Sequence, residues 1–314
     1  MKYVCKRIGT LIITLLIVSM LAFLAFEVIP GDPATSMLGT EATESKVNAL
    51  REEMGLNRPL PVRYADWLTS FVTGDMGESY SYHTPVSEMI AGKLPITLAI
   101  TLMSFFFMIL LSFPVGILSA KYENRLPDRI MFAVNQLLMA VPPFFTGIIF
   151  TVVFGLTFRW FTPGGYVSYT KDMGAFLAYL ILPSLAIALP KAAMTAKMLR
   201  GSMITELRKD YVRTAYSRGN SENQVLFHHV LKNGILPVVT FLGWAVADVI
   251  AGSIIVEQVF GIPGLGRTLI TSISGRDYPV VEAVIVLIAA VILTINVIVD
   301  LLYQKLDKRI EIAG

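Results

Sequence analysis

Long runs of uncharged, mostly apolar residues alternate with short charged segments along the chain. Four runs carry no charged residue, and two more are interrupted only by Asp248 and by Asp300. Each run is close to or above the length that an α-helix needs to cross about 30 Å of hydrocarbon. We therefore predict an all-α membrane protein with six transmembrane helices, in residues 8–26, 94–120, 130–158, 173–190, 234–256 and 283–303.

The interior of these predicted spans, away from their ends, contains Pro114, Pro142, Pro143 and Pro183. Proline would break a helix in water, but a membrane helix tolerates it where neighbours satisfy the freed backbone groups. We expect these prolines to kink spans rather than end them.

Six spans place both termini on one side, and the basic residues indicate which side. The segments on the side of the termini hold 17 Lys and Arg residues, whereas the two short loops opposite hold four. Basic residues gather in cytoplasmic loops. We expect both termini to be cytoplasmic. The first run resembles a secretory signal, but no cleavage site follows it, so it is predicted to remain as a span.

The segment 30–93 between the first two spans is predicted to lie outside the cell. Its turn-forming residues flank two stretches with helical patterns, 45–54 and 62–71. Trp67 and Phe71 are four residues apart and share one face of the second helix. A small folded cap is expected here rather than a free linker.

The composition agrees with a membrane protein. Hydrophobic residues make up 54% of the chain, charged residues 16%, and the mean hydropathy is +0.65. A soluble domain has about 25% charged residues. The net charge of +3 is too small to indicate a nucleic-acid partner.

No catalytic or metal-binding pattern is present in the sequence. The motifs H-E-x-x-H and G-x-S-x-G and any Cys-His grouping are missing. His228 and His229 are adjacent, so on a helix they diverge by about 100° and do not chelate one ion. We expect no catalytic residue, no metal site and no cofactor in this chain.

The run from Gly261 to Thr268 resembles a phosphate-binding loop, with Arg267 in place of its lysine. Such a loop needs a strand before it and a helix after it on the side where ATP is found. This run instead follows a span that leads outward. A tight external turn is the better interpretation, and the chain is predicted to have no ATPase motor of its own.

A helix, a glycine turn and a second helix are predicted on the cytoplasmic side in residues 201–233. Ile204, Leu207, Tyr211 and Ala215 recur at spacings of three, four and four, which places them on one helical face. Gly219 ends that helix. Ser221 and Gln224 then form a capping-box pattern that opens the next helix. The alternative is an ordinary basic juxtamembrane loop.

At this point the chain resembles a known family. The run Asp210-Tyr211-Val212-Arg213-Thr214-Ala215 with Gly219 is similar to the E-A-A-x-x-x-G signature of ABC importer membrane subunits, in the form used by dipeptide, oligopeptide and nickel permeases. Further matches span nearly the whole chain, among them Ile29-Pro30-Gly31-Asp32-Pro33, Gly74-Asp75, Pro263-Gly264-Leu265-Gly266, Arg276-Asp277-Tyr278-Pro279 and Leu306-Asp307. Departures occur at Tyr216, Ser217 and Lys308, and Asp248 stands where relatives place a small or apolar residue.

The resemblance implies a type I ABC importer permease fold in the inner membrane of a bacterium or archaeon, and a protein that is not itself an enzyme. It implies a first helix and external segment in 1–93, a five-helix core in 94–304 with a coupling helix at about 203–218, and a cytoplasmic tail in 305–314. ATP and Mg would be bound by two separate ATPase subunits, which the signature residues Asp210 to Ala215 and Gly219 would contact. A second similar permease and an extracytoplasmic binding protein are the other implied partners. Peptides, nickel or other metal chelates, and glutathione-like molecules are the implied substrates.

Polar residues inside the spans are candidates for lining the translocation pathway. An ionisable group in lipid costs several kcal/mol unless it faces a partner or water. The candidates are Asp248, Asn135, Gln136 and Asn296, and interhelical hydrogen bonding is the alternative for the three amides. Asp300 lies near the cytoplasmic boundary and is expected to be structural. The rival functions are a secondary transporter or channel without ATPases, and a membrane-anchored scaffold.

Overall fold

The computed structural model describes residues 2–28, 33–38, 43–53 and 55–306. The contacts divide the chain into two units, one formed by Met1–Ile96 and Pro263–Val297 and the other by Thr97–Ile262 and Ile298–Gly314. Every regular element in the described ranges is a helix, and one isolated bridge pairs Glu78 with Pro85. The predicted all-α fold class is confirmed.

The first unit combines the N-terminal helix and the segment that follows it with two helices from near the C-terminus. Its helices are α1 (Lys2–Val28), α2 (Pro33–Leu38), α3 (Glu44–Glu53), α4 (Leu60–Thr73), α5 (Val86–Ala91), α14 (Leu265–Ser274) and most of α15 (Tyr278–Leu306). Helices α3 and α4 coincide with the two that were predicted in this segment. The rings of Trp67 and Phe71 lie 5.3 Å apart on α4, as their spacing predicted.

Aromatic contacts and one carboxylate hold this unit together. Phe23 of α1 packs against Tyr64 and Trp67 of α4, with ring centroids 5.6 and 6.0 Å apart. Asp277 is 1% exposed and accepts hydrogen bonds from the hydroxyl of Ser79 at 2.5 Å and the amide of Tyr80 at 2.9 Å. These bonds join parts of the chain almost 200 residues apart.

The second unit contains the middle of the chain. Its elements are α6 (Leu94–Lys121, of which the first three residues belong to the other unit), α7 (Leu126–Ala140), α8 (Pro143–Phe150), the π-helical segment η1 (Thr151–Thr157), α9 (Met173–Leu207), α10 (Asp210–Ser217), α11 (Glu222–Gln224), the π-helical segment η2 (Val225–Val230), α12 (Leu231–Gly234) and α13 (Leu236–Phe260). Helix α9 is central, because it packs against α7, α8 and α13.

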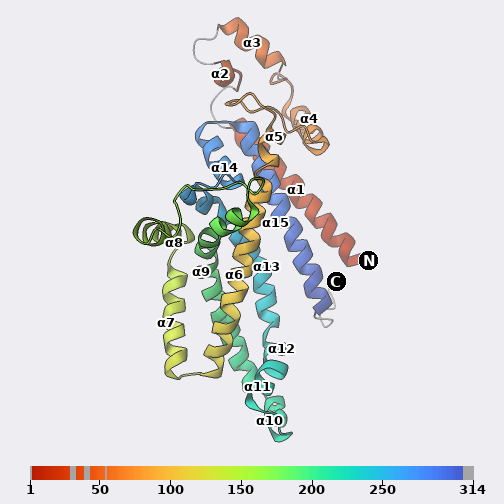
Figure 1. Cartoon of the computed structure of the whole chain (residues 1–314). Helices are drawn as coiled ribbons and strands as arrows, with labels where there is room; N and C mark the ends of the chain where they lie inside the picture. Colours follow the sequence, from red (N-terminus) through yellow and green to blue (C-terminus); the bar gives the residue numbers. More distant parts are fainter. Residues whose placement is uncertain (1, 29–32, 39–42, 54, 307–314) are drawn as a thin grey trace. The chain divides into compact units, whose positions relative to one another are not determined.

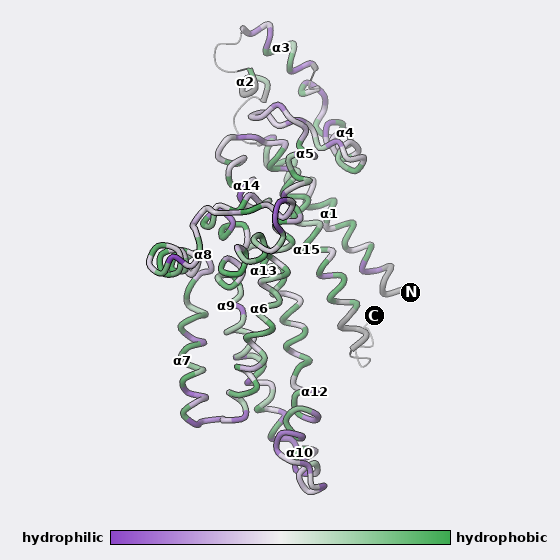
Figure 2. The backbone as a smooth tube through the Cα atoms, viewed as in Figure 1, coloured by the Kyte–Doolittle hydropathy of each residue, from purple (hydrophilic) through white to green (hydrophobic). Residues whose placement is uncertain are grey.

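Five helices in the described residues are long and apolar enough to cross a membrane, and a sixth span is possible if a bent pair of helices counts as one. Figure 2 shows α6, α9 and α13 as largely hydrophobic, whereas α10 is hydrophilic. Pro114 and Pro183 lie within continuous helices, as expected.

The predicted span 130–158 is not one continuous helix. Helix α7 ends at Ala140, and the next helix begins at Pro143 after a bend of 100°. Pro142 and Pro143 therefore end a helix instead of kinking it. Pro142 disfavours the helical conformation at Val141, which adopts an extended ψ of 122°.

Candidate functional site

The apolar face predicted for one helix across residues 204–218 is divided between two helices. Helix α9 extends to Leu207, and α10 begins at Asp210 after a break at Arg208 and Lys209. Lys209 has an extended ψ of 151°. The prediction of a single helix was wrong, because a repeating apolar pattern can continue through a break when both helices pack against the same core.

The apolar side of α10 faces the interior of its own unit. Val212 is 2% exposed and Ala215 is 5% exposed, in a cluster that contains Met203 and Leu199 of α9 and Val225 of η2. Val212 and Ala215 are among the residues that the family resemblance assigns to the ATPase contact, and in this unit their burial fixes α10 against α9 and η2.

Polar contacts secure the junction between α9 and α10. Glu206 accepts hydrogen bonds from the ammonium group of Lys209 at 2.6 Å and the hydroxyl of Tyr211 at 2.8 Å. The bond to Glu206 raises the pKa of Lys209, and burial is the main cause of a raised pKa at Tyr211. Asp210, Arg213 and Thr214 remain exposed on the outer side of α10.

Gly219 forms the turn that was predicted after this helix. Its φ is +84°, a conformation that L-residues rarely adopt, and no atom would meet a Cβ added there within 4 Å. The predicted capping box follows, since the side chain of Ser221 accepts from the amide of Gln224 and the Gln224 side chain accepts from the amide of Ser221. His228 and His229 lie in η2.

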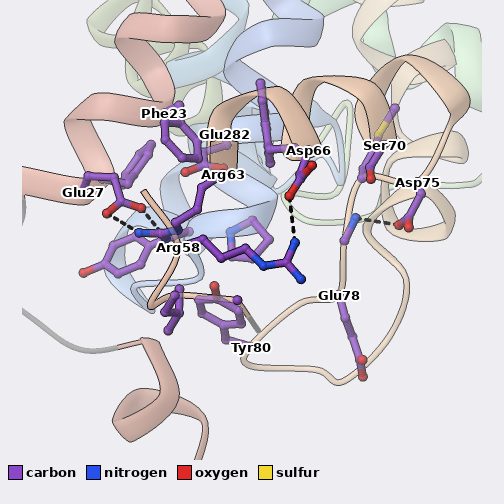
Figure 3. Close-up of a pocket in the computed structure, with 18 of the residues that line it drawn as sticks. Phe23, Glu27, Arg58, Arg63, Asp66, Ser70, Asp75, Glu78, Tyr80 and Glu282 are labelled. Carbon is purple, nitrogen blue, oxygen red and sulfur yellow. Dashed lines mark hydrogen bonds and ion pairs between the residues drawn. The ribbon is translucent and has the colours of Figure 1, made fainter. Parts of the chain in front are cut away.

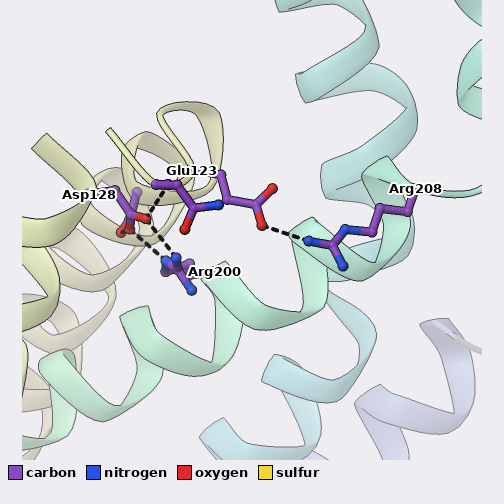
Figure 4. A network of polar contacts seen from close by, with 6 residues as sticks. Glu123, Asp128, Arg200 and Arg208 are labelled. Carbon is purple, nitrogen blue, oxygen red and sulfur yellow. Dashed lines mark hydrogen bonds and ion pairs between the residues drawn. The ribbon is translucent and has the colours of Figure 1, made fainter. Parts of the chain in front are cut away.

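A buried ion pair links α9 to the start of α7 (Figure 4). The Nε and Nη2 atoms of Arg200 each donate at 2.6 Å to one oxygen of Asp128, whose side chain is 3% exposed. Ser119 of α6 donates its hydroxyl at 2.5 Å and Asn124 its amide at 2.9 Å to the same carboxylate. Asp128 therefore connects three helices and the turn between two of them.

Asp248, the leading pathway candidate, has a partner within its own chain. Its Oδ2 lies 2.5 Å from the Nζ of Lys191, and α13 carries the acid while α9 carries the base. The Asp248 side chain is still 60% exposed and that of Lys191 is 23% exposed. Trp244, one turn before Asp248, is 79% exposed on the same helix. The pair thus lies on a surface of its unit, between two apolar helices.

The other three candidates occupy different environments. Gln136 of α7 accepts a hydrogen bond at 3.0 Å from Lys197 of α9. Asn135 is buried within the same unit, and Asn296 is half-buried on α15 in the other unit. An open cavity of about 700 Å³ adjoins Lys197 and is lined by methionines from α7 and α9, together with Glu206, Pro237 and Phe241.

Three basic residues of α9 were not predicted to lie on a membrane-spanning helix. Lys191, Lys197 and Arg200 were counted as loop residues because the uncharged run ends at Pro190, but α9 continues to Leu207. Their spacing of six and three residues within a stretch with no turn former could have suggested a continuing helix.

Two other segments bear on the predictions. The run that resembles a phosphate-binding loop follows helix α13 rather than a strand, and Gly261 caps that helix with a φ of 68°. Residues 29–32 and 307–314, which carry part of the family pattern and the tail, fall outside the described residues, as does the side chain of Asp300.

Comparisons with known proteins match nearly the whole chain. The family model "Binding-protein-dependent transport system inner membrane component" covers residues 112–312, and the corresponding N-terminal model covers residues 1–101. A "probable peptide ABC transporter permease protein" from Sinorhizobium fredii is 35% identical over 98% of this chain and 99% of its own length. A "glutathione transport system permease protein", GsiC, from Salmonella typhimurium is 37% identical over 99% of each chain.

Proposed function

Because this chain belongs to the family of binding-protein-dependent transport system inner membrane components, we propose that it carries peptides across the membrane as one permease subunit of an ABC importer. Similarity over almost the full length to proteins named for peptide and glutathione transport supports this substrate class. Glutathione is itself a small peptide. Nickel, the other predicted cargo, appears in neither name.

The proposal includes partners and an orientation. Two ATPase subunits bind the cytoplasmic side, a second permease completes the pathway, and an extracytoplasmic binding protein delivers the substrate. The distribution of basic residues supports cytoplasmic termini. Basic residues still predominate on the side of the termini when the three basic residues of α9 are left out of the count. Membership of this family favours an importer over a secondary transporter, channel or scaffold.

Helix α10 and the turn at Gly219 form the ATPase-coupling element in this proposal. The buried Val212 and Ala215 pack α10 against the end of α9. A displacement of α10 by the ATPase subunits is therefore transmitted to α9, a helix long enough to span the membrane. The exposed Asp210, Arg213 and Thr214 are then the residues that contact the ATPase, whereas Gly219 sets the direction of the following helix.

Gly219→Val is expected to uncouple ATP hydrolysis from transport. A β-branched residue strains a backbone with positive φ by about 1–2 kcal/mol, so the turn should rearrange. Peptide uptake and substrate-stimulated ATPase turnover should both fall, while the amount of assembled complex in the membrane stays near normal. Gly219→Asn is the matched control, because asparagine tolerates positive φ, and it should retain most coupling. Normal stimulated turnover in the valine variant would contradict the coupling role.

The ion pair of Lys191 and Asp248 supports a pathway along the surface between α9 and α13. A charged pair that is partly exposed on two apolar helices is unfavourable against hydrocarbon. Such a surface is stable where it meets water or another protein chain. We therefore assign this surface to the side that faces the second permease and the substrate.

Two charge-removing variants should test this assignment by opposite effects. Asp248→Asn leaves a net positive surface and should reduce uptake of cationic peptides more than of anionic ones, by about fivefold for about 1 kcal/mol of electrostatic interaction. Lys191→Gln should reverse that preference. Competition assays in proteoliposomes with matched tripeptides of charge +1, 0 and −1 would measure it. Equal losses for all three peptides, together with a lower melting temperature, would instead indicate a structural pair.

A further inference from the structure

A second polar cavity lies within the first unit, apart from the residues assigned to transport. It has a volume of about 500 Å³ and opens between α1, α4, α15 and the loops that flank α4 (Figure 3). Pockets that enclose small ligands fall in the range of about 300–1,000 Å³. The cavity is therefore large enough for a molecule of the size of a modified amino acid.

Acidic groups exceed basic groups in the lining of this cavity. Five carboxylates and two guanidinium groups border it, which gives a net charge of −3. Both arginines already have acidic partners. Arg63 forms a bidentate ion pair with Glu27, in which its two terminal nitrogens lie 2.5 and 2.8 Å from the carboxylate oxygens. The Nη1 atom of Arg58 lies 3.0 Å from the Oδ2 atom of Asp66.

Glu282 is the half-buried carboxylate of this lining, and no hydrogen bond or ion pair joins it to another described residue. It lies on α15 within the lining and is only partly accessible. Figure 3 shows Glu282 near Arg63 and Glu27. Arg63 attracts the Glu282 carboxylate through space, but both of its terminal nitrogens contact Glu27, and no direct hydrogen bond or ion pair joins Arg63 to Glu282. A carboxylate in a partly dry site is stabilised by a cation that reaches it.

Aromatic rings form the walls beside Glu282. Phe26 packs on Tyr278 with centroids 5.2 Å apart, Tyr80 meets Tyr278 edge-on at 6.5 Å, and Trp67 and Phe23 complete the lining. The negative faces of such rings attract ammonium and guanidinium groups within about 6 Å. Aromatic walls around an unpaired carboxylate are therefore the features of a site for an organic cation.

We propose that this cavity binds a small organic cation, whose ammonium or guanidinium group contacts Glu282 while its body lies against the aromatic rings. The site is separate from Lys191 and Asp248, which belong to the other unit. The proposal does not depend on what the importer transports. Its chemical basis is a half-buried carboxylate without a cationic partner, in a cavity whose two arginines are already paired and whose walls are aromatic.

The test uses the assembled importer in lipid nanodiscs and two probes of nearly equal shape. N-acetyl-argininamide carries a guanidinium group, and N-acetyl-citrullinamide carries a neutral urea. Calorimetric titration should show saturable binding of the first and at least about tenfold weaker binding of the second, as the loss of a charge-assisted contact implies. Equal affinity for the two probes, or no saturable binding of the cation, would overturn the proposal.

Variants of the lining locate the site. Glu282→Gln should weaken binding of N-acetyl-argininamide by about tenfold or more. Glu78→Gln removes an exposed carboxylate from the same lining and should leave affinity within about twofold. Unchanged affinity in Glu282→Gln would count against the proposal.

A labelling experiment decides the question even if Glu282→Gln fails to assemble. Ser70 lines the cavity and the chain has one native cysteine, so Ser70→Cys combined with Cys5→Ser provides a single thiol there. N-acetyl-argininamide should slow maleimide labelling of that thiol, whereas the citrulline probe should not. Labelling at the same rate with both probes would place the cation elsewhere and refute the assignment.

Discussion

Arg200→Met is expected to lower the stability of the folded subunit by about 3–5 kcal/mol, the usual loss when one partner of a buried ion pair is removed. Asp128 would keep only the bonds from Ser119 and the Asn124 amide, and its carboxylate is 3% exposed. A buried charge with two neutral donors is poorly compensated. The melting temperature of the purified complex and the amount of subunit in the membrane should both fall sharply.

The double variant Arg200→Met with Asp128→Leu separates the loss of attraction from the cost of an unpaired charge. Replacing both partners by apolar residues is often nearly neutral, so the double variant should recover most of the lost stability. Arg208→Met is the matched single control, because the pair of Arg208 with Glu123 is more exposed, and its loss should be about 0–1 kcal/mol. A double variant as unstable as Arg200→Met would show that the pair itself stabilises the fold.

Asp277→Ala should open the first unit locally, with a loss of about 3–4 kcal/mol. The substitution removes the acceptor of the Ser79 hydroxyl and of the Tyr80 amide, and each buried donor left unpaired costs about 1–3 kcal/mol. Ser79 is fully buried, so water does not readily replace the carboxylate. Limited proteolysis of the complex should therefore cut residues 74–86 much faster than in the native protein.

Asp75→Ala provides the control within the same segment. Asp75 is exposed, and its side chain accepts a bond from Gly77 two residues away, so its loss should change the cleavage rate little. If both variants are cleaved at the native rate, the contact with Asp277 does not hold the segment in place. Cleavage that spreads into α7 or α9 would show that the two units unfold together.

The sequence predicts the helices of this chain well where one local signal determines them. Hydropathy identifies the long spans, and the turn at Gly219 and the capping box at Ser221 depend on residues within four positions of each other. These features follow from backbone preferences and hydrogen bonds that form inside a short segment, so they do not require knowledge of the rest of the fold.

Features that depend on distant residues were not predicted. The buried side of α10 is determined by Met203, Leu199 and Val225, so its pattern alone did not show whether Val212 faces a partner or its own chain. Asp248 and Lys191 are 57 residues apart, and a single sequence gives no signal that they meet. Hydropathy also does not record direction, which is why the 100° bend after α7 was missed.

Pro190 allows the part of α9 that follows it to pivot relative to the part before it. Proline removes one backbone hydrogen bond at its position in the helix, which makes Pro190, like Pro183 before it, a more compliant point of α9. The part of the helix beyond it, up to Leu207, is about 25 Å long at 1.5 Å per residue. A pivot of about 10° at Pro190 would move the attachment of α10 by about 4 Å. Lys191 directly follows Pro190, so this pivot barely displaces it. Arg200 lies about halfway between Pro190 and Leu207, so the same pivot displaces it and strains its ion pair with Asp128.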